Sequence, residues 1–422
     1  MTISSPTRLE ALLAEKAGRP VRAGEVVTLP VDVIMAHDAT LALLIDEFTR
    51  LGCAVRDPDR VMVTCDHFAP PARIDWADLQ RAVIDFSQRR GLDLRLYQGI
   101  CHQLLLEDRR VTPGTLLVGA DSHTTLAGAV GAVATGLGAT DILACLATGE
   151  TWFRVPESIG VTLTGAPKPW VMGRDAALYL LGHFGEAGAG YRALELRDRT
   201  ANGLTMDSRA AICCMATEMG AKAALFVPDA VTAAFLRARD GAPWTFPDED
   251  AAACAETLTI ALDALDSLIA CPHSPANIAG VREVEGTPLH QVYIGSCAGG
   301  RLEDFAMAAA IVAGRTVAPG LKVIAVPSSV TVMREAMRRG YIHTLLDAGV
   351  CVSNPSCGAC GGIDKGVLGS GETALMTSTR NFQGRLGPRD SAVYLASTAV
   401  CAASALTGRI THPADVWWEE GR

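Results

Sequence analysis

Short runs of β-branched and other apolar residues alternate with helical patterns along the whole of this chain. The predicted strands are residues 60–65, 115–119, 160–163, 291–294 and 322–326. Apolar positions at helical spacing follow such strands, for example over residues 76–90 and 329–339. Because parallel strands need crossover connections, usually helices, this alternation predicts an α/β fold with largely parallel sheets.

The length of 422 residues exceeds what one hydrophobic core usually holds, so more than one domain is expected. Pro and Gly residues gather at 156–168, and the chain turns polar between residues 272 and 288. The sequence therefore predicts three α/β domains, with bounds at residues 1–160, 161–286 and 287–422.

The composition excludes several classes of protein. Hydrophobic residues make up 49% and charged residues 20%, which is typical of a folded globular chain. With 37 basic and 46 acidic residues, the net charge of −9 argues against nucleic acid or an anionic membrane as partner. No apolar run reaches the roughly 18–20 residues of a membrane span, and no secretory leader is visible.

Thirteen cysteines in a chain without a leader indicate reduced thiols, so a cytoplasmic protein is expected. Cys357 and Cys360 form a Cys-Gly-Ala-Cys motif, whose turn can point both sulfurs at one metal centre. The motif alone leaves open a structural zinc site, for which a second pair at the usual spacing is missing. It also leaves open a thioredoxin-like redox pair.

A third cysteine, Cys297, directly follows the predicted strand 291–294, where an α/β sheet usually presents its ligands. Three cysteines can hold a four-iron cluster and leave one iron open as a Lewis acid. The remaining cysteines are predicted to be mostly buried, inert thiols: Cys53, Cys65, Cys101, Cys145, Cys213, Cys214, Cys254, Cys271, Cys351 and Cys401.

Three segments with histidines mark the first half of the chain, residues 66–67, 101–103 and 121–123, of which the first and third follow predicted strands and contain an acid. A satisfied structural histidine is the alternative for each segment taken alone. The candidates are Asp66, His67, His102, Asp121 and His123. A neighbouring carboxylate raises the basicity of a histidine and fixes its tautomer, which suits a general acid. Glu218 lies in an otherwise apolar helical stretch, so it calls for a partner if it is buried.

Arg380 and Arg385 stand five residues apart among small residues, a pattern that suits a di- or tricarboxylate substrate. A solvated basic loop is the alternative for this segment. The sequence contains no Walker-type phosphate loop, no G-x-S-x-G and no H-E-x-x-H motif, and the Gly-rich run 128–138 lacks dinucleotide-binding spacing, which indicates helix packing.

Four segments, in this order, resemble motifs of the aconitase superfamily: residues 118–124, 294–297, 357–360 and 380–385. The resemblance covers essentially the whole chain and is strongest to isopropylmalate dehydratase large subunits. Residues 147–157 are similar to the shorter subtype, which includes homoaconitases and dimethylmalate dehydratases. The resemblance implies three α/β/α domains around a central iron–sulfur cluster, without the swivelling fourth domain.

The resemblance also implies roles for single residues. Cys297, Cys357 and Cys360 match ligands of a 4Fe–4S cluster with one iron not ligated by protein. Asp66 and His67 match the pair that protonates the departing hydroxyl.

Two further acids match the partners of histidines: Asp121 that of His102, and Glu218 that of His123. The residues that match substrate contacts are His37, Ser122, Arg380 and Arg385.

The implied activity is that of a hydro-lyase, which removes and re-adds water beside a carboxylate of a hydroxy di- or tricarboxylic acid. The family's base is a serine on the swivelling domain, whose motif this sequence lacks. A separate small subunit is therefore expected to supply that serine and another arginine, and the isolated chain is expected to be inactive.

Four positions depart from the family's pattern. Ala298 and Gly299 stand where Thr-Asn is usual, and Cys214 and Thr379 each replace an asparagine. Such changes around a cluster alter ligand orientation and potential, so the exact substrate stays open. Beside an isopropylmalate-like substrate, the alternatives are dimethylmalate, citramalate or homoaconitate, and a regulatory iron–sulfur binding protein.

Overall fold

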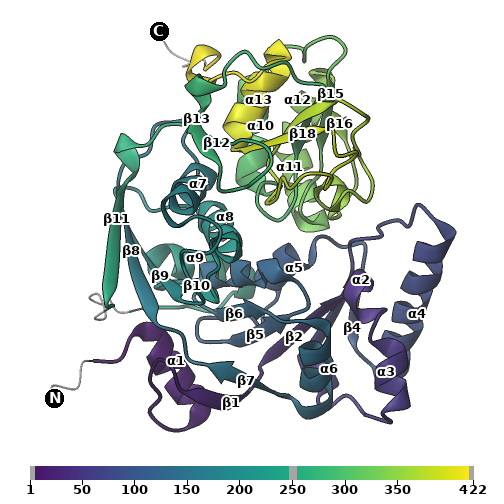
Figure 1. Ribbon diagram of the computed structural model, residues 1–422, viewed down its shortest axis with the longest axis vertical. Helices are drawn as coiled ribbons and strands as arrows, with labels where there is room; N and C mark the ends of the chain where they lie inside the picture. The colour runs from purple at the N-terminus through teal and green to yellow at the C-terminus, as the bar shows by residue number, and fades with distance from the viewer. Residues whose placement is uncertain (1–4, 247–253, 418–422) are drawn as a thin grey trace. The chain divides into compact units, whose positions relative to one another are not determined.

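The computed structural model describes residues 5–246 and 254–417. Its contacts divide the chain into two compact units, between which the chain passes several times (Figure 1). Unit 1 consists of Met1–Leu96, Leu104–Gly165 and Ala187–Ala261. Unit 2 consists of Tyr97–Gln103, Ala166–Glu186 and Leu262–Arg422.

Unit 1 contains a five-stranded parallel sheet in the order β4-β3-β2-β5-β6. Its strands are β2 (Val33–His37), β3 (Val61–Cys65), β4 (Asp93–Leu96), β5 (Leu116–Gly119) and β6 (Val133–Gly136). The three central strands are buried along their whole length, as expected for a parallel sheet covered on both faces.

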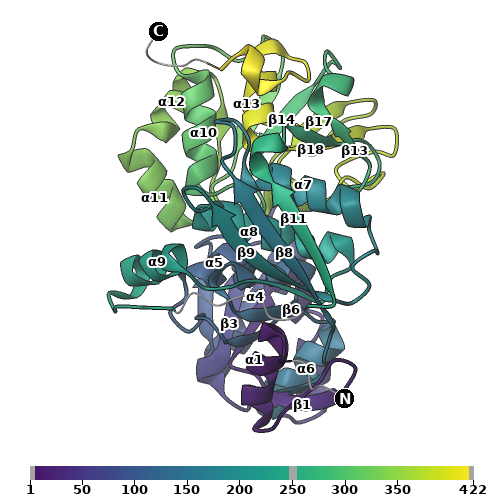
Figure 2. The same ribbon diagram turned by 90° about the vertical axis from the view of Figure 1, so that its left-hand side faces the viewer.

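A second parallel sheet of unit 1 has four strands in the order β10-β9-β8-β11. Figure 2 labels β9, β8 and β11 of this sheet, which run side by side. They are β8 (Ser158–Gly165), β9 (Ala193–Thr200), β10 (Ala223–Phe226) and β11 (Glu256–Ala261). An antiparallel ribbon of β1 (Val26–Pro30) and β7 (Glu150–Arg154) completes the strands described for this unit.

The helices of unit 1 follow the sequence signals for helix ends. The α-helices are α1 (Arg8–Ala17), α2 (Asp38–Leu41), α3 (Ile45–Arg50), α4 (Ile74–Arg90), α6 (Ala139–Thr148), α8 (Met206–Met215) and α9 (Ala230–Asp240). Thr7 and Glu10 form a capping box at the start of α1, and Gly18 ends it in the left-handed conformation. The 3-10 helices are η1 (Pro58–Arg60), η2 (Ser122–Val130) and η3 (Ala216–Met219).

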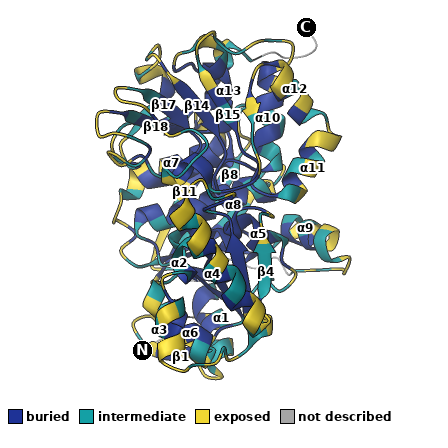
Figure 3. Cartoon of the chain, turned by 90° about the vertical axis from the view of Figure 1, so that its right-hand side faces the viewer, coloured by how far each residue is buried: buried dark blue, intermediate teal, exposed yellow. Residues whose placement is uncertain are grey.

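Unit 2 is built on a seven-stranded sheet in the order β13-β12-β18-β17-β14-β15-β16. Its strands are β12 (Leu268–Ala270), β13 (Ile278–Gly280), β14 (Gln291–Ile294), β15 (Lys322–Ala325), β16 (Cys351–Val352), β17 (Thr373–Met376) and β18 (Ala392–Ala396). The five strands from β18 to β16 are parallel, and β12 pairs antiparallel with both β18 and the edge strand β13. β14 lies at the centre and is fully buried (Figure 3).

Helices cover this sheet and bury its core. They are α7 (Gly173–Phe184), α10 (Leu302–Val312), α11 (Val330–Arg338), α12 (Tyr341–Asp347) and α13 (Thr398–Thr407), with η4 (Leu262–Ala264), η5 (Val281–Glu283), η6 (Gly358–Gly361) and η7 (Pro413–Asp415). Phe305 of α10 and Val400 of α13 pack with Val292 of β14 in one hydrophobic cluster. The short helix α5 (Cys101–Glu107) begins in unit 2 and ends in unit 1.

The α/β class and the five predicted strands are confirmed, since β3, β5, β8, β14 and β15 lie where the sequence places them. The Gly-rich run 128–138 contains β6 as well as tight packing, because a Cβ at Gly128 would meet the backbone of β10. The three domain boundaries stay a prediction. The structure has three principal sheets, but α7, β12 and β13 join unit 2. Over the described ranges, no helix is long and apolar enough to cross a membrane.

Candidate active site and metal centre

The predicted histidines and acids of unit 1 lie at one edge of its five-stranded sheet. His37 ends β2, Asp66 and His67 directly follow β3, and Asp121 comes two residues after β5. Because these neighbouring strands are parallel, their carboxyl ends meet at the same edge. The fold therefore brings together side chains that are far apart in the sequence.

His37 and His67 stack on each other at this edge. Their ring centroids are 4.1 Å apart and the rings are inclined by 17°. His37 Nε2 lies 3.0 Å from the hydroxyl of Thr40 and 3.2 Å from the carbonyl of Ala120, so this imidazole is held in place from two sides. His67 lies beyond the end of the adjoining strand β3, next to Asp66.

Two buried carboxylates surround His67. Its Nδ1 lies 3.1 Å from Asp66 Oδ1 and 3.7 Å from Asp38 Oδ1. Burial lowers the pKa of His67, but the charges of Asp66 and Asp38 and the hydrogen bond to Asp66 outweigh it and raise the pKa to about 10. His67 therefore carries both ring protons at neutral pH, which suits a proton donor.

Asp38 is a residue that the sequence reasoning missed. Its carboxylate accepts the backbone N–H groups of His67 and Phe68 at 3.2 and 3.0 Å, so it fixes the turn that presents His67. Burial first, and then the charge of Asp66, raise the pKa of Asp38 above its ordinary value. In the sequence, Asp38 follows a strand that ends in His37, so the pair His37-Asp38 has the reverse order of Asp66-His67.

His37, Asp38, Asp66 and His67 each offer one ligand atom, and these four atoms lie within 4.8 Å of one another. Two carboxylates and two imidazoles so close together can share protons. The protonation of His67 is therefore a property of the whole group.

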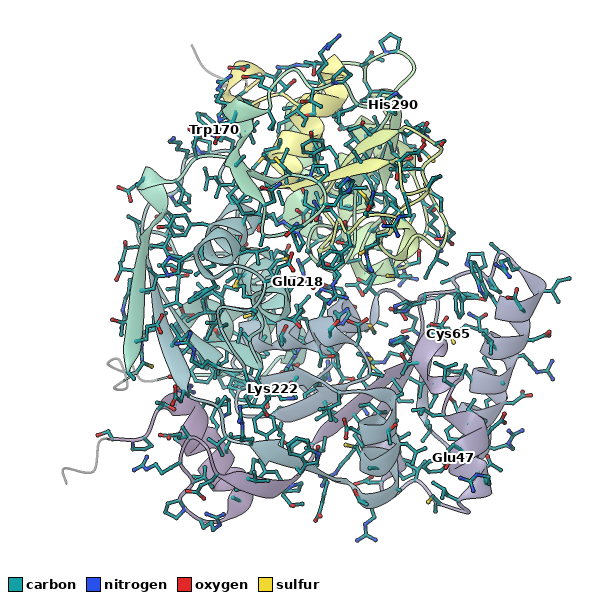
Figure 4. The ribbon with its side chains drawn as sticks, in the orientation of Figure 1. Glu47, Cys65, Trp170, Glu218, Lys222 and His290 are labelled. Atoms are coloured by element: carbon teal, nitrogen blue, oxygen red, sulfur yellow. The ribbon has the colours of Figure 1, made fainter. Side chains whose placement is uncertain are left out.

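A second pairing in unit 1 joins His123 and Glu218. His123 lies on η2 and Glu218 on η3, and the distance from Nε2 to Oε1 is 2.7 Å; Figure 4 labels Glu218. On the other side of the ring, Nδ1 lies 3.3 Å from Asp121 Oδ1. The structure thus places His123 between two acids. Glu218 is buried, and His123 is the partner that a buried acid in an apolar stretch needs.

Ser122 begins η2 and lines an open cavity of about 340 Å³ in unit 1. Thr125, Thr135, Thr217 and Lys222 also line it, together with glycines, Leu137 and Ala221, so its wall is mixed. Thr217 precedes Glu218 in the chain, so the cavity adjoins the segment that carries this acid.

The three candidate ligand cysteines of unit 2 lie on loops that follow strands of its sheet. Cys297 comes three residues after β14, while Cys357 and Cys360 lie on the connection after β16. No disulfide joins any of the thirteen cysteines, all of which lie in the described ranges. Parallel strands direct these connections to the carboxyl edge of the sheet, where ligands usually bind.

The turn at Cys297 is held by the neighbouring strand β17. Thr377 Oγ1 accepts the N–H of Gly295 at 2.8 Å, and Ser296 Oγ donates to the carbonyl of Thr377 at 3.2 Å. Ser296 has φ of 72°, a left-handed conformation that a serine rarely adopts. The side chain of Thr377 also explains Gly299, because a Cβ there would lie 2.4 Å from Thr377 Cβ.

Cys357 and Cys360 share one short turn above the phenol of Tyr293. Gly358 has φ of 61°, and a Cβ on it would lie 2.7 Å from Tyr293 Oη, so glycine is required between the cysteines. Burial, followed by the charges of Cys360 and Cys357, raises the pKa of Tyr293 and keeps the phenol neutral. Tyr293 is a second residue near the site that the sequence reasoning did not identify.

The residues around these loops fit an iron–sulfur group. Buried hydroxyls of Ser328, Ser356 and Thr379 have no hydrogen-bond partner within the described part of the chain. They follow β15, β16 and β17, at the same edge as the cysteines. Buried polar groups normally find partners, and sulfur or a polar substrate at this edge would provide them. Three cysteine thiols with such hydroxyls at the same edge are the donor set that a cluster of this kind needs.

Arg380 and Arg385 also belong to unit 2, on the segment after β17. Arg385 Nε donates to the carbonyl of Cys360 at 3.0 Å, so this arginine supports the cysteine turn. Asn381 donates to the carbonyls of Cys271 and Val393, which anchors the segment beside Arg380. Neither arginine is fully exposed, which is unlike a freely solvated basic loop.

His102 lies in unit 2, although the sequence reasoning placed it with the first domain. The segment Tyr97–Gln103 is bonded to residues 328–330, for example through the N–H of Ile100 and the carbonyl of Ser328 at 2.8 Å. Its Nδ1 lies 3.5 Å from the sulfur of Cys101. The pairing of His102 with Asp121 of unit 1 stays a prediction.

The cysteines outside the candidate cluster follow the expected burial in part. Cys65, Cys101, Cys145, Cys213, Cys214 and Cys401 are buried. Cys53, Cys254 and Cys271 are partly exposed, and Cys351 is exposed. The exposed Cys351 begins the edge strand β16, where one side of the strand faces solvent.

Comparisons with known proteins agree with this geometry. The model of the aconitase family (aconitate hydratase) matches residues 10–408. The chain is 43% identical over 399 residues to the 3-isopropylmalate dehydratase large subunit of Syntrophus aciditrophicus, covering 93% of this chain and 95% of that protein. It is 41% identical over 416 residues to the probable 3-isopropylmalate dehydratase large subunit of Methanothermobacter thermautotrophicus, covering 97% and 99%. It is also 41% identical over 416 residues to the homoaconitase large subunit of Thermus thermophilus, covering 98% and 99%.

Proposed function

The chain belongs to the aconitase family, a family of iron–sulfur hydro-lyases, and from that premise we propose that it is the large subunit of an isopropylmalate dehydratase-like enzyme. The observation that carries the proposal is the position of three cysteines, Cys297, Cys357 and Cys360, on loops at the carboxyl edge of one parallel sheet. These thiols would hold a 4Fe–4S cluster with one iron not ligated by protein. When bound, the cluster supplies a Lewis acid for a substrate hydroxyl.

In this proposal the side chains of unit 1 handle protons. His67 donates a proton to the departing hydroxyl, because the charges of Asp66 and Asp38 keep the imidazole protonated at neutral pH. His123 and Glu218 form a second proton-holding pair, supported by their 2.7 Å contact. His102 acts with Asp121.

The remaining candidates bind and orient the substrate. Arg380 and Arg385 pair with its carboxylates, since a guanidinium can hold a carboxylate through two parallel hydrogen bonds. His37 and Ser122 contact its polar groups. The names of the relatives, which are large subunits, support a small-subunit partner for this chain. That partner supplies the catalytic serine and another arginine. A cytoplasmic location, predicted from the thiols, is part of the same proposal.

The test is an anaerobic assay of this chain co-expressed with its small subunit. Hydration is followed as the loss of ultraviolet absorbance of the unsaturated acids isopropylmaleate, citraconate, dimethylmaleate and homoaconitate. We expect turnover of isopropylmaleate above the others, and its loss in Cys357→Ser. Cys351→Ser is the matched control, because this exposed thiol lies outside the proposed ligand set and its variant should keep full activity. A complex with intact cluster that hydrates none of the four acids would contradict the proposal.

A further inference from the structure

Arg301 is a buried cation that pairs with no carboxylate of the described residues. Its side chain is among the largest fully buried ones in the chain, with 1% of the residue exposed. Within residues 5–246 and 254–417, its guanidinium forms one hydrogen bond, from Nη2 to the backbone carbonyl of Cys297. Its Nε and Nη1 are buried and have no partner in that part of the chain.

Another fully buried arginine of the same chain shows what such a group normally requires. Arg209 forms ion pairs with Asp198 at 2.7 Å and with Asp229 at 2.6 Å. Burying a guanidinium without an anion costs several kcal/mol, because the charge loses its hydration. An arginine cannot avoid this cost by losing its proton, since a guanidinium stays protonated in proteins. The described part of the chain therefore supplies no anion for Arg301.

Asp304, which contacts the backbone of Arg301, does not serve as that anion. The Asp304 carboxylate accepts the backbone N–H of Arg301 at 3.0 Å and the hydroxyl of Thr398 at 2.6 Å. These contacts cap the first turn of α10. The guanidinium of Arg301 instead donates to the carbonyl of Cys297. The positive charge is thus fixed at the turn that presents a candidate ligand.

We propose that Arg301 is a positioning residue for the iron–sulfur group, holding the Cys297 turn and supplying the positive charge that balances the anionic cluster. The inference rests on the proposed function, because the anion is the cluster with its three thiolates. A 4Fe–4S core of charge 2+ bound by three thiolates has a net charge of −1, and reduction by one electron makes it more negative. A fixed buried cation favours the reduced form and so raises the reduction potential.

The test compares Arg301→Gln and Arg301→Lys in the co-expressed complex, loaded anaerobically with iron and sulfide. The readouts are iron and sulfide content and the midpoint potential of the cluster, followed by electron paramagnetic resonance. We expect Arg301→Gln to lower the equilibrium constant for reduction at least tenfold, which is about 59 mV for one electron. Arg301→Lys keeps the positive charge, so its midpoint potential should lie close to that of wild type.

Arg315→Gln is the matched control. Arg315 also donates to a backbone carbonyl, that of Val416, but it lies beyond the other end of α10, about 16 Å along the helix from Arg301. Its variant should have the wild-type potential.

Each result of these measurements either supports or overturns the proposed role of Arg301. Loading that is lost in Arg301→Gln but kept in Arg301→Lys supports the charge role, whereas loss in both variants indicates a requirement for shape and overturns it. An unchanged potential in a fully loaded Arg301→Gln complex also overturns it. A wild-type complex that takes up no cluster would instead refute the proposed function, so the two failures are distinguishable.

Discussion

His123 and Glu218, 95 positions apart in the sequence, meet with 2.7 Å between Nε2 and Oε1 in the interior of unit 1. Both side chains are buried, so neither can exchange its partner for water without a cost in free energy. We expect Glu218→Gln to lower kcat about 100-fold or more, because the proton-holding pair is lost while the shape is kept.

Steady-state hydration kinetics of the complex measure this loss. Glu256→Gln is the control, since Glu256 forms an exposed ion pair with Arg192 and such pairs contribute little. Equal kcat values for Glu218→Gln and wild type would remove Glu218 from the proposed chemistry.

His67 should make the stability of the chain depend on alkaline pH. Its pKa is raised from 6.5 to about 10 in the folded chain, because the charges of Asp66 and Asp38 outweigh the effect of burial. The protonated imidazole therefore contributes stability that is fully present below pH 6.5 and is lost as the pH rises to about 10. The difference in thermal midpoint between wild type and His67→Gln should shrink over this range. A constant difference would show that His67 is neutral in the folded chain.

Asp38 should matter for both the fold and the proton donor. In Asp38→Asn one amide group must face a backbone N–H of His67 or Phe68, which leaves a buried donor unpaired and costs about 1–3 kcal/mol. Removing the charge should also lower the pKa of His67, which proton NMR of the imidazole measures. Asp75→Asn, in an exposed pair with Arg73, should change neither quantity. An unaltered His67 pKa in Asp38→Asn would rule out the positioning role.

Gly299 should not tolerate replacement by asparagine. A Cβ at this position would lie 2.4 Å from Thr377 Cβ, and overpacking of this kind costs about 1–3 kcal/mol. Thermal unfolding of Gly299→Asn should therefore show a lower midpoint than wild type. Gly369→Ala is the control, since its Cβ would make only ordinary contact, at 3.5 Å, with Glu372. A midpoint at or above that of wild type for Gly299→Asn would mean that Thr377 moves aside.

The sequence predicts the fold class and the strand positions because strand–helix alternation is a local pattern. It also shows Asp66-His67 and Cys357-Gly-Ala-Cys360, whose members are near neighbours in the chain. The pairing of His123 with Glu218 came from resemblance, because nothing local links two residues so far apart. The chain crossings between the two units could not be predicted, since α7 and the segment Tyr97–Gln103 join unit 2 through long-range contacts.

Asp38 and Arg301 were missed for a related reason. A charged residue next to a turn is usually solvated, and only the fold shows that both side chains are buried. Asp38 acts through the backbone of residues 29 and 30 positions further on, and Arg301 through a carbonyl. Contacts to backbone leave no pattern of side chains to be recognised in a sequence.

The central claim is that Cys297, Cys357 and Cys360 hold the group on which hydration depends. The most direct measurement is the isopropylmaleate hydration rate of the co-expressed complex before and after anaerobic loading with iron and sulfide, in wild type and in Cys360→Ser. The account predicts that activity in wild type rises in proportion to bound iron, and that Cys360→Ser stays inactive after loading. Equal activity in the two proteins, or activity that does not depend on bound iron, would contradict it.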